Sequence, residues 1–151
     1  MTVLYFEDFV VGQKYLGRGR YVFDAEGIKS FAAAYDPEPF HLDAAAAERN
    51  PALRGLTASG WHTASVTMRL LVESELQPVA GILGLGADEI RWLRPVRPGD
   101  ALRVESEVIA IRPSESRPVQ GVVKVRTTTF NQANDPVQIL VSNLLVERRA
   151  P

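Results

Sequence analysis

The spacing of apolar residues changes once along this chain, and that change restricts the possible folds more than any other feature. Before about residue 80, apolar residues recur every three or four positions, which predicts helices. After it they alternate with polar residues, which predicts strands over residues 82–93, 101–111, 119–131 and 137–147. The turns between these strands are short and rich in Pro, Gly, Asn and Asp, so the strands should form an antiparallel meander.

The first half of the chain should contain one strand followed by helices. Residues 13–23 have the pattern of a strand, although Gly17 and Gly19 weaken it or introduce a bulge. Aspartate is a good N-cap because its carboxylate accepts hydrogen bonds from the first free N–H groups of a helix. Two shorter helices are each preceded by such a residue: Asp24 before residues 25–35, and Asp43 before residues 44–49.

The longest predicted helix begins within residues 57–60 and ends near Glu75 or Leu76. Its apolar residues form a wide stripe made of Trp61, Ala64, Val66, Met68, Leu70, Leu71 and Val72. A helix with so broad an apolar surface should be surrounded by other structure. One strand, then helices, then four strands therefore predict an α+β fold in which an antiparallel sheet wraps around a long central helix.

Composition excludes several classes of protein. A chain of 151 residues with ordinary hydrophobic content is expected to form a single domain over residues 1–151. Its net charge of −1 excludes the broad basic surface that is typical of nucleic-acid or membrane binding. Cysteine is absent, which excludes disulfides and thiolate chemistry, and the presence of only two histidines argues against a metal site. No signal peptide or membrane-spanning run is visible, so we expect a cytoplasmic protein.

The segment from Tyr35 to Asp43 reads Tyr-Asp-Pro-Glu-Pro-Phe-His-Leu-Asp and carries the candidate chemistry. Its two prolines lack an N–H and favour extended backbone before them, so we expect no regular helix here. Such a rigid segment can hold Asp36 and His41 over one cleft. Imidazole titrates near neutral pH, so His41 is a candidate for proton transfer. We interpret His62 as structural and Glu38 as a solvated loop acid.

Four landmarks resemble a known family. The run Asp36-x-Glu38-Pro39-Phe40-His41, with Ala47 six residues later, resembles the hydratase motif of MaoC-like dehydratases and (R)-specific enoyl-CoA hydratases, which have the hotdog fold. The other landmarks are Glu7–Gly12, similar to the N-terminal F-x-x-G, Ser59-Gly60-Trp61 at the start of the central helix, and Leu93–Asp100, similar to F-x-x-P-V-x-x-G-D. The sequence departs from the family pattern at Tyr35, where the family has Gly, and at Glu38, where it has Asn.

The resemblance implies reversible hydration of a trans-2-enoyl-CoA to a 3-hydroxyacyl-CoA with R stereochemistry and no cofactor. Asp36 and His41 would bind and activate one water molecule, and one of them would return a proton to the α carbon; the sequence does not decide which. Gly60 would donate its backbone N–H to the thioester oxygen from the N-terminus of the central helix. The implied partners are an acyl-CoA substrate and at least one further copy of the chain, because family members form dimers that join their sheets.

Two other functions remain open at this point. A hotdog thioesterase would hydrolyse the thioester, although the proline-bounded Asp36 and His41 favour a hydratase. A non-catalytic acyl-CoA-binding subunit is favoured by Glu38 and disfavoured by the presence of both proton-handling residues. The sequence does not give the length or branching of the acyl group. Three basic residues near the expected entrance of the site, which could meet the phosphates of coenzyme A, are interpreted as an ordinary solvated face: Arg91, Arg94 and Arg97.

Overall fold

The computed structural model describes residues 2–150 and confirms the division into a helical half and a strand half. The four predicted strands are β3 (Leu83–Trp92), β4 (Ala101–Pro113), β5 (Gln120–Phe130) and β6 (Pro136–Glu147). All neighbouring strands are antiparallel, in the order β4-β5-β6-β3, and the short strand β1 (Lys14–Leu16) lies on the other side of β4. Strand β3 therefore lies at one edge of the sheet.

The single strand expected over residues 13–23 is wrong, because the chain there forms two short strands. These are β1 (Lys14–Leu16) and β2 (Tyr21–Val22), and both pair with β4. At Gly17 the backbone lies against β4, where its N–H donates to the carbonyl of Val104 over 2.9 Å. A Cβ at Gly17 would lie 3.0 Å from Val104, so glycine permits this close approach. The chain then leaves the ladder until Tyr21.

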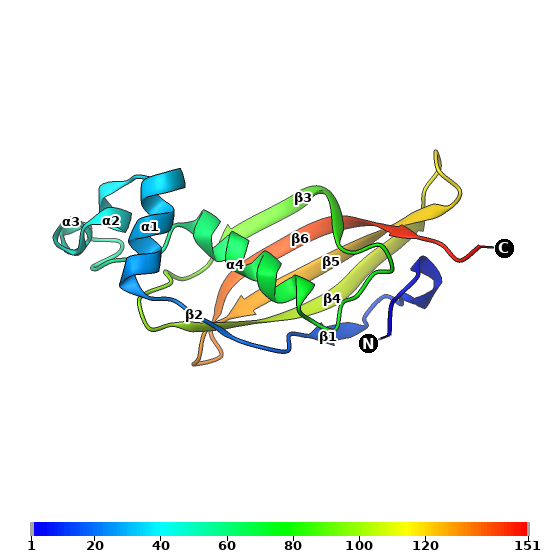
Figure 1. Cartoon of the computed structure of the whole chain (residues 1–151), viewed down its shortest axis with the longest axis horizontal. Coiled ribbons are helices and arrows are strands. Elements are labelled where there is room, and N and C mark those ends of the chain that lie inside the picture. Colours follow the sequence, from blue (N-terminus) through cyan, green and yellow to red (C-terminus); the bar gives the residue numbers. More distant parts are fainter. Residues whose placement is uncertain (1, 151) are drawn as a thin grey trace.

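Three helices gather at one end of the sheet (Figure 1). They are α1 (Ala25–Tyr35), α2 (Pro39–Leu42) and α3 (Ala44–Arg49). Both predicted caps are confirmed, since Asp24 accepts from the N–H of Gly27 and Asp43 accepts from the N–H of Ala45. The expectation of no helix in the proline segment is wrong for α2. Pro39 occupies the first turn of that helix, where its missing N–H costs no hydrogen bond.

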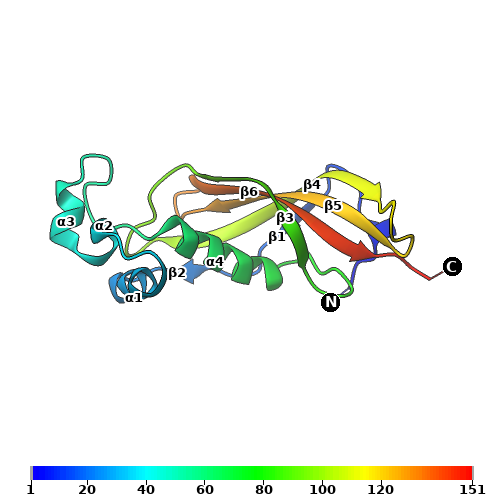
Figure 2. The same cartoon turned by 90° about the horizontal axis from the view of Figure 1, so that it is seen from above.

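Helix α4 (Gly60–Val72) lies along one face of the sheet (Figures 1 and 2). It ends before the predicted Glu75 or Leu76. At Ser74 the backbone N–H and the hydroxyl both donate to the carbonyl of Leu71, over 3.0 and 2.7 Å, and the helical pattern stops. The predicted apolar stripe is only partly correct. The residues that α4 buries are His62, Thr63, Val66, Thr67, Leu70 and Leu71, whereas Trp61, Met68 and Val72 are exposed. Within this chain the sheet therefore covers one face of α4 and leaves a second apolar face uncovered.

The core between α4 and the sheet consists of two apolar clusters. One surrounds Leu71 near the C-terminal end of α4 and includes Val108, Val125 and Leu144. The other surrounds Val66 and Leu70 of α4 and includes Ile28 of α1 together with Phe23 and Leu102. The second cluster packs α1 against α4, and the proline segment follows directly from the end of α1.

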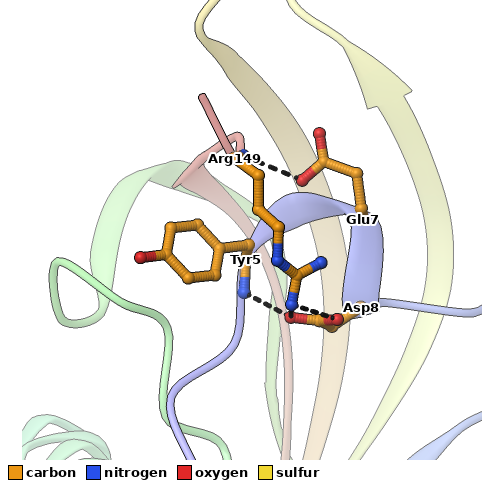
Figure 3. Close-up of polar contacts among 4 residues, drawn as sticks. All are labelled: Tyr5, Glu7, Asp8 and Arg149. Carbon is orange, nitrogen blue, oxygen red and sulfur yellow. Dashed lines mark hydrogen bonds and ion pairs between the residues drawn. The ribbon is translucent and has the colours of Figure 1, made fainter. Parts of the chain in front are cut away.

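The two ends of the described chain are tied together at the end of the sheet remote from α1–α3 (Figures 1 and 3). The Arg149 guanidinium donates to both carboxylate oxygens of Asp8 over 2.8 and 2.7 Å, and its backbone N–H donates to Glu7. The side-chain hydrogen bond from Arg149 and the N–H of Tyr5 lower the pKa of Asp8 below its usual 3.8. These contacts are exposed, so they orient the terminal segments rather than supply much stability.

Candidate active site

The loop before α4 fixes the orientation and the tautomer of the His41 ring. It lies on α2, is only 8% exposed, and its Nδ1 is 2.6 Å from the carbonyl oxygen of Thr57. A carbonyl oxygen can only accept, so Nδ1 carries the hydrogen and donates it. In the neutral ring Nε2 is then an acceptor, which is the form that a general base requires.

Asp36 meets the free nitrogen of that ring. It caps the C-terminus of α1, and its Oδ2 lies 3.5 Å from His41 Nε2. Pro37 turns the chain between α1 and α2, so two residues five positions apart face each other. When Asp36 is ionised and His41 is neutral, both facing atoms are hydrogen-bond acceptors. The arrangement is suited to a donor that both can bind, such as the two O–H groups of a water molecule or a shared proton.

A pocket of about 280 Å³ opens beside this pair. His41 and Gly60, which are distant in sequence, both line it, together with Thr57, Thr63 and Trp92. Asp36 is not among the lining residues and reaches the pocket through its contact with His41. Of the three predicted site residues, the structure thus places two on one pocket wall and the third against one of them.

Gly60 is the first residue of α4 and lies beneath the indole of Trp92. Ser59 caps the helix by accepting from the N–H of Trp61, and the first N–H groups of a helix have no partner within it. The positive end of the helix dipole therefore faces the pocket at Gly60. A Cβ at this position would lie 2.4 Å from the Trp92 ring, so only glycine fits without displacing the wall.

Among the lining residues that the sequence interpretation missed, three bear on the site's geometry. Thr57 supplies the carbonyl that orients His41, and no side-chain pattern signals such a role. Trp92 stands three residues before Pro95, at the aromatic position of the F-x-x-P landmark, and this signal could have identified it. Arg94, interpreted as part of a solvated face, lines the pocket while its side chain stays 56% exposed. Arg97 lies elsewhere and donates to the carbonyl of Leu53, another lining residue.

The structure places His62 in an aromatic layer beside the site rather than on its wall. Its ring stacks on Phe31 at 4.6 Å between centroids and lies 4.6 Å from Phe23. Burial lowers the pKa of His62 below its usual 6.5, and the opposing effect of Asp24 is smaller. This packing agrees with the structural role expected for His62. Glu38 is exposed at the start of α2, as expected for a solvated acid.

The lowered pKa of His62 predicts a loss of stability in mild acid. The unfolded chain takes up the proton at a higher pH than the folded chain. The contribution of the neutral His62 ring to the free energy of unfolding is therefore complete above pH 6.5, and it is lost as the pH falls through the lower pKa that His62 has in the folded chain. Replacing His62 with Phe preserves the stacking and removes the titration. The Tm of the wild type should therefore fall more than that of His62→Phe between about pH 7 and about pH 5. Parallel Tm profiles would contradict this assignment.

Comparison with known proteins identifies the family. The profile described as MaoC like domain matches residues 8–131, which is most of the chain. The chain belongs to the MaoC-like domain family. A solved structure of a MaoC-like dehydratase from Rhodospirillum rubrum is 46% identical, covers 98% of this chain and 99% of its own, and has a TM-score of 0.91. The membership and the hotdog fold expected from the sequence are both confirmed.

Other similar proteins bear names that describe hydration. The R-hydratase PhaJ1 from Pseudomonas aeruginosa is 27% identical with a TM-score of 0.71, and covers 96% of this chain and 86% of its own. Mesaconyl-CoA hydratase from Cereibacter sphaeroides is 44% identical over 68 residues, which is 45% of this chain. The matched part is 20% of that hydratase, so the likeness concerns a fraction of a much longer protein.

Two kinds of feature are not seen among residues 2–150. In this part of the chain no group of three or more His, Cys, Asp or Glu side chains is placed to hold a metal ion. No helix within the same residues is long and apolar enough to cross a membrane. The cytoplasmic location and the lack of a cofactor stay predictions.

Proposed function

We propose that this protein is a hydro-lyase that reversibly adds water to a trans-2-enoyl-CoA and forms a 3-hydroxyacyl-CoA with R stereochemistry. The observation that carries the proposal is the Asp36–His41 pair, with 3.5 Å between Oδ2 and Nε2, at a pocket that His41 shares with Gly60. The hydratase names of several relatives support the same reaction. A single domain over residues 1–151 is part of the proposal.

The proposed reaction uses the pair as a water-binding base and acid. One O–H of the water is directed to Asp36 and the other to Nε2 of His41, since both atoms accept. As the oxygen bonds to the β carbon, one of the pair takes the proton that the water loses. A proton from the pair then reaches the α carbon on the same face, so the hydroxyl and the hydrogen of one water are added across the double bond.

Gly60 is proposed to stabilise the charge that develops on the thioester oxygen. Addition to the β carbon pushes electrons toward the carbonyl and produces an enolate-like oxygen. A backbone N–H at the start of α4, with the helix dipole behind it, favours negative charge at that point. The Trp92 indole packs on the side of Gly60 where a Cβ would stand and forms a pocket wall beside this donor.

A homodimer is proposed as the working form. Strand β3 is an edge strand, and the apolar face of α4 beside it is uncovered in a single chain, with Met68 41% and Val72 53% exposed. A second copy that pairs along β3 would give hydrogen-bond partners to the free backbone groups of this edge strand. The same contact would bury the adjacent apolar face of α4. Higher assemblies of such dimers are compatible with this arrangement.

A charge on this face should separate the dimer. Replacing Val72 with Glu would bury a carboxylate in the proposed interface, whereas Val119→Glu makes the same change at a residue that is 67% exposed and far from α4. We expect sedimentation or light scattering to show dimers for the wild type and Val119→Glu, and monomers for Val72→Glu. A Val72→Glu protein that remains dimeric would place the interface elsewhere.

The proposed reaction is tested by following the loss of enoyl-thioester absorbance with a panel of trans-2-enoyl-CoA substrates. The product should be a 3-hydroxyacyl-CoA, whose configuration is read with a dehydrogenase specific for one enantiomer. Release of free thiol at the same rate is the control for hydrolysis. Thiol release without hydration would favour the thioesterase, and acyl-CoA binding without turnover would favour a non-catalytic subunit.

A further inference from the structure

A row of hydrogen-bonded polar side chains crosses the face of the sheet beneath α4. Thr129 on β5 is the register partner of Gln138 on β6, and Gln138 is the register partner of Trp92 on β3. The three side chains therefore form one rung across neighbouring strands. Thr67 from α4 completes it from above, since its hydroxyl lies 2.7 Å from that of Thr129. We call these four residues the polar rung.

The polar rung is fully buried at its centre and linked by hydrogen bonds. The Trp92 indole N–H donates to Gln138 Oε1 over 2.9 Å, and Gln138 Nε2 donates to the Thr67 hydroxyl over 3.0 Å. Thr67, Thr129 and Gln138 have no exposed surface. Displacing any of them would leave a buried polar group without a partner, so the rung resists invasion by an apolar chain.

The polar rung separates two hollow spaces between α4 and the sheet. On one side lies the reaction pocket with Thr63, and on the other an apolar cavity of about 90 Å³ with Leu71. Thr63, Thr67 and Leu71 follow at four-residue spacing on one face of α4, so the rung residue stands between the two lining residues. The strands show the same order. Thr127 and Leu140 are the next register pair on this face of the sheet after Thr129 and Gln138, and both line the apolar cavity.

We propose that the polar rung, of which Trp92 alone lines the reaction pocket, closes the way from that pocket to the apolar cavity and so restricts the enzyme to short acyl groups. This inference rests on the proposed function and names its substrate class. The fixed indole of Trp92 walls the pocket above Gly60, and the buried amide of Gln138 holds that indole in place. A longer acyl chain reaches the apolar cavity only when the rung is shortened.

The activity test compares kcat/KM for crotonyl-CoA and trans-2-octenoyl-CoA in the wild type, Gln138→Ala and Thr129→Ala. The wild type should prefer crotonyl-CoA by roughly tenfold or more, and both variants should raise the relative value for octenoyl-CoA, Gln138→Ala by roughly tenfold. Thr128→Ala is the matched control, because it makes the same change one residue away on the opposite face of β5 and should leave the ratio unchanged. A wild type that prefers octenoyl-CoA, or folded variants with the wild-type ratio, would overturn the inference.

A binding measurement keeps this inference separate from the proposed reaction. Calorimetry with butyryl-CoA and octanoyl-CoA should show no gain in affinity with length for the wild type. In Gln138→Ala or the milder Thr129→Ala, octanoyl-CoA should bind about fourfold more tightly for each additional methylene that is buried. Absence of any hydration together with this binding pattern would reject the proposed reaction and retain the length limit. If affinity rises with acyl length equally in the wild type and in the variants, the proposed length limit is rejected.

Discussion

Replacing Asp36 with Asn should lower kcat/KM for enoyl-CoA hydration by about 100-fold or more, the usual contribution of a general acid or base. The amide keeps the size of the carboxylate but cannot take a proton from water or return one to the substrate. His41→Ala should have a comparable effect, because it removes the nitrogen 3.5 Å from Asp36. Steady-state hydration with each folded variant provides the measurement.

The pair should also behave as a unit. If both residues act on one water, the double variant will be little slower than either single variant, because removal of the first already abolishes the shared step. Glu38→Gln is the matched control, since it neutralises an exposed acid two residues from Asp36 and should retain nearly full activity. Loss of activity in Glu38→Gln, or near-normal rates in Asp36→Asn, would reject the assignment.

Replacing Gly60 with Ala should reduce hydration by about 100-fold or more, the order expected when an oxyanion donor is displaced. The added Cβ would lie 2.4 Å from the Trp92 ring, so either the start of α4 or the indole must move. Movement of the helix start displaces the N–H from the thioester oxygen. The loss should fall mainly on kcat, because the interaction strengthens in the transition state.

Two controls separate the clash between a Cβ at position 60 and the Trp92 ring from the general effect of replacing a glycine with alanine. Gly19→Ala makes the same substitution where no atom lies within 4 Å of the new Cβ, and it should leave activity unchanged. Combining Gly60→Ala with Trp92→Ala removes the clash, so the double variant should be as stable as Trp92→Ala alone. If Gly60→Ala is fully active, the proposed role of the Gly60 N–H is wrong.

Local sequence features predicted the elements well because they act over a few residues. Alternation of apolar and polar residues located β3 to β6, and the carboxylates of Asp24 and Asp43 marked two helix starts. Two errors had different causes. Leaving the ladder at Gly17 depends on contact with β4, which is distant in sequence. The short helix α2 was missed for a local reason, because Pro39 falls at its first turn, where proline is tolerated.

The candidate site was predicted less completely than the fold. The motif located Asp36, His41 and Gly60, and the structure brings His41 and Gly60 to one pocket with Asp36 against the imidazole. The carbonyl that fixes the imidazole belongs to Thr57 and has no side-chain signature.

By itself the sequence determined the order of elements, the family and the three residues proposed for the chemistry, because each is encoded in periodicity or in a short motif. Only the tertiary structure decided which face of α4 is buried and which stays open at Met68 and Val72, since both faces are apolar in sequence. It also brought Thr67, Gln138 and Trp92 into one hydrogen-bonded row. Residues on separate elements meet only when strand register and helix packing are set, and no local pattern carries that information.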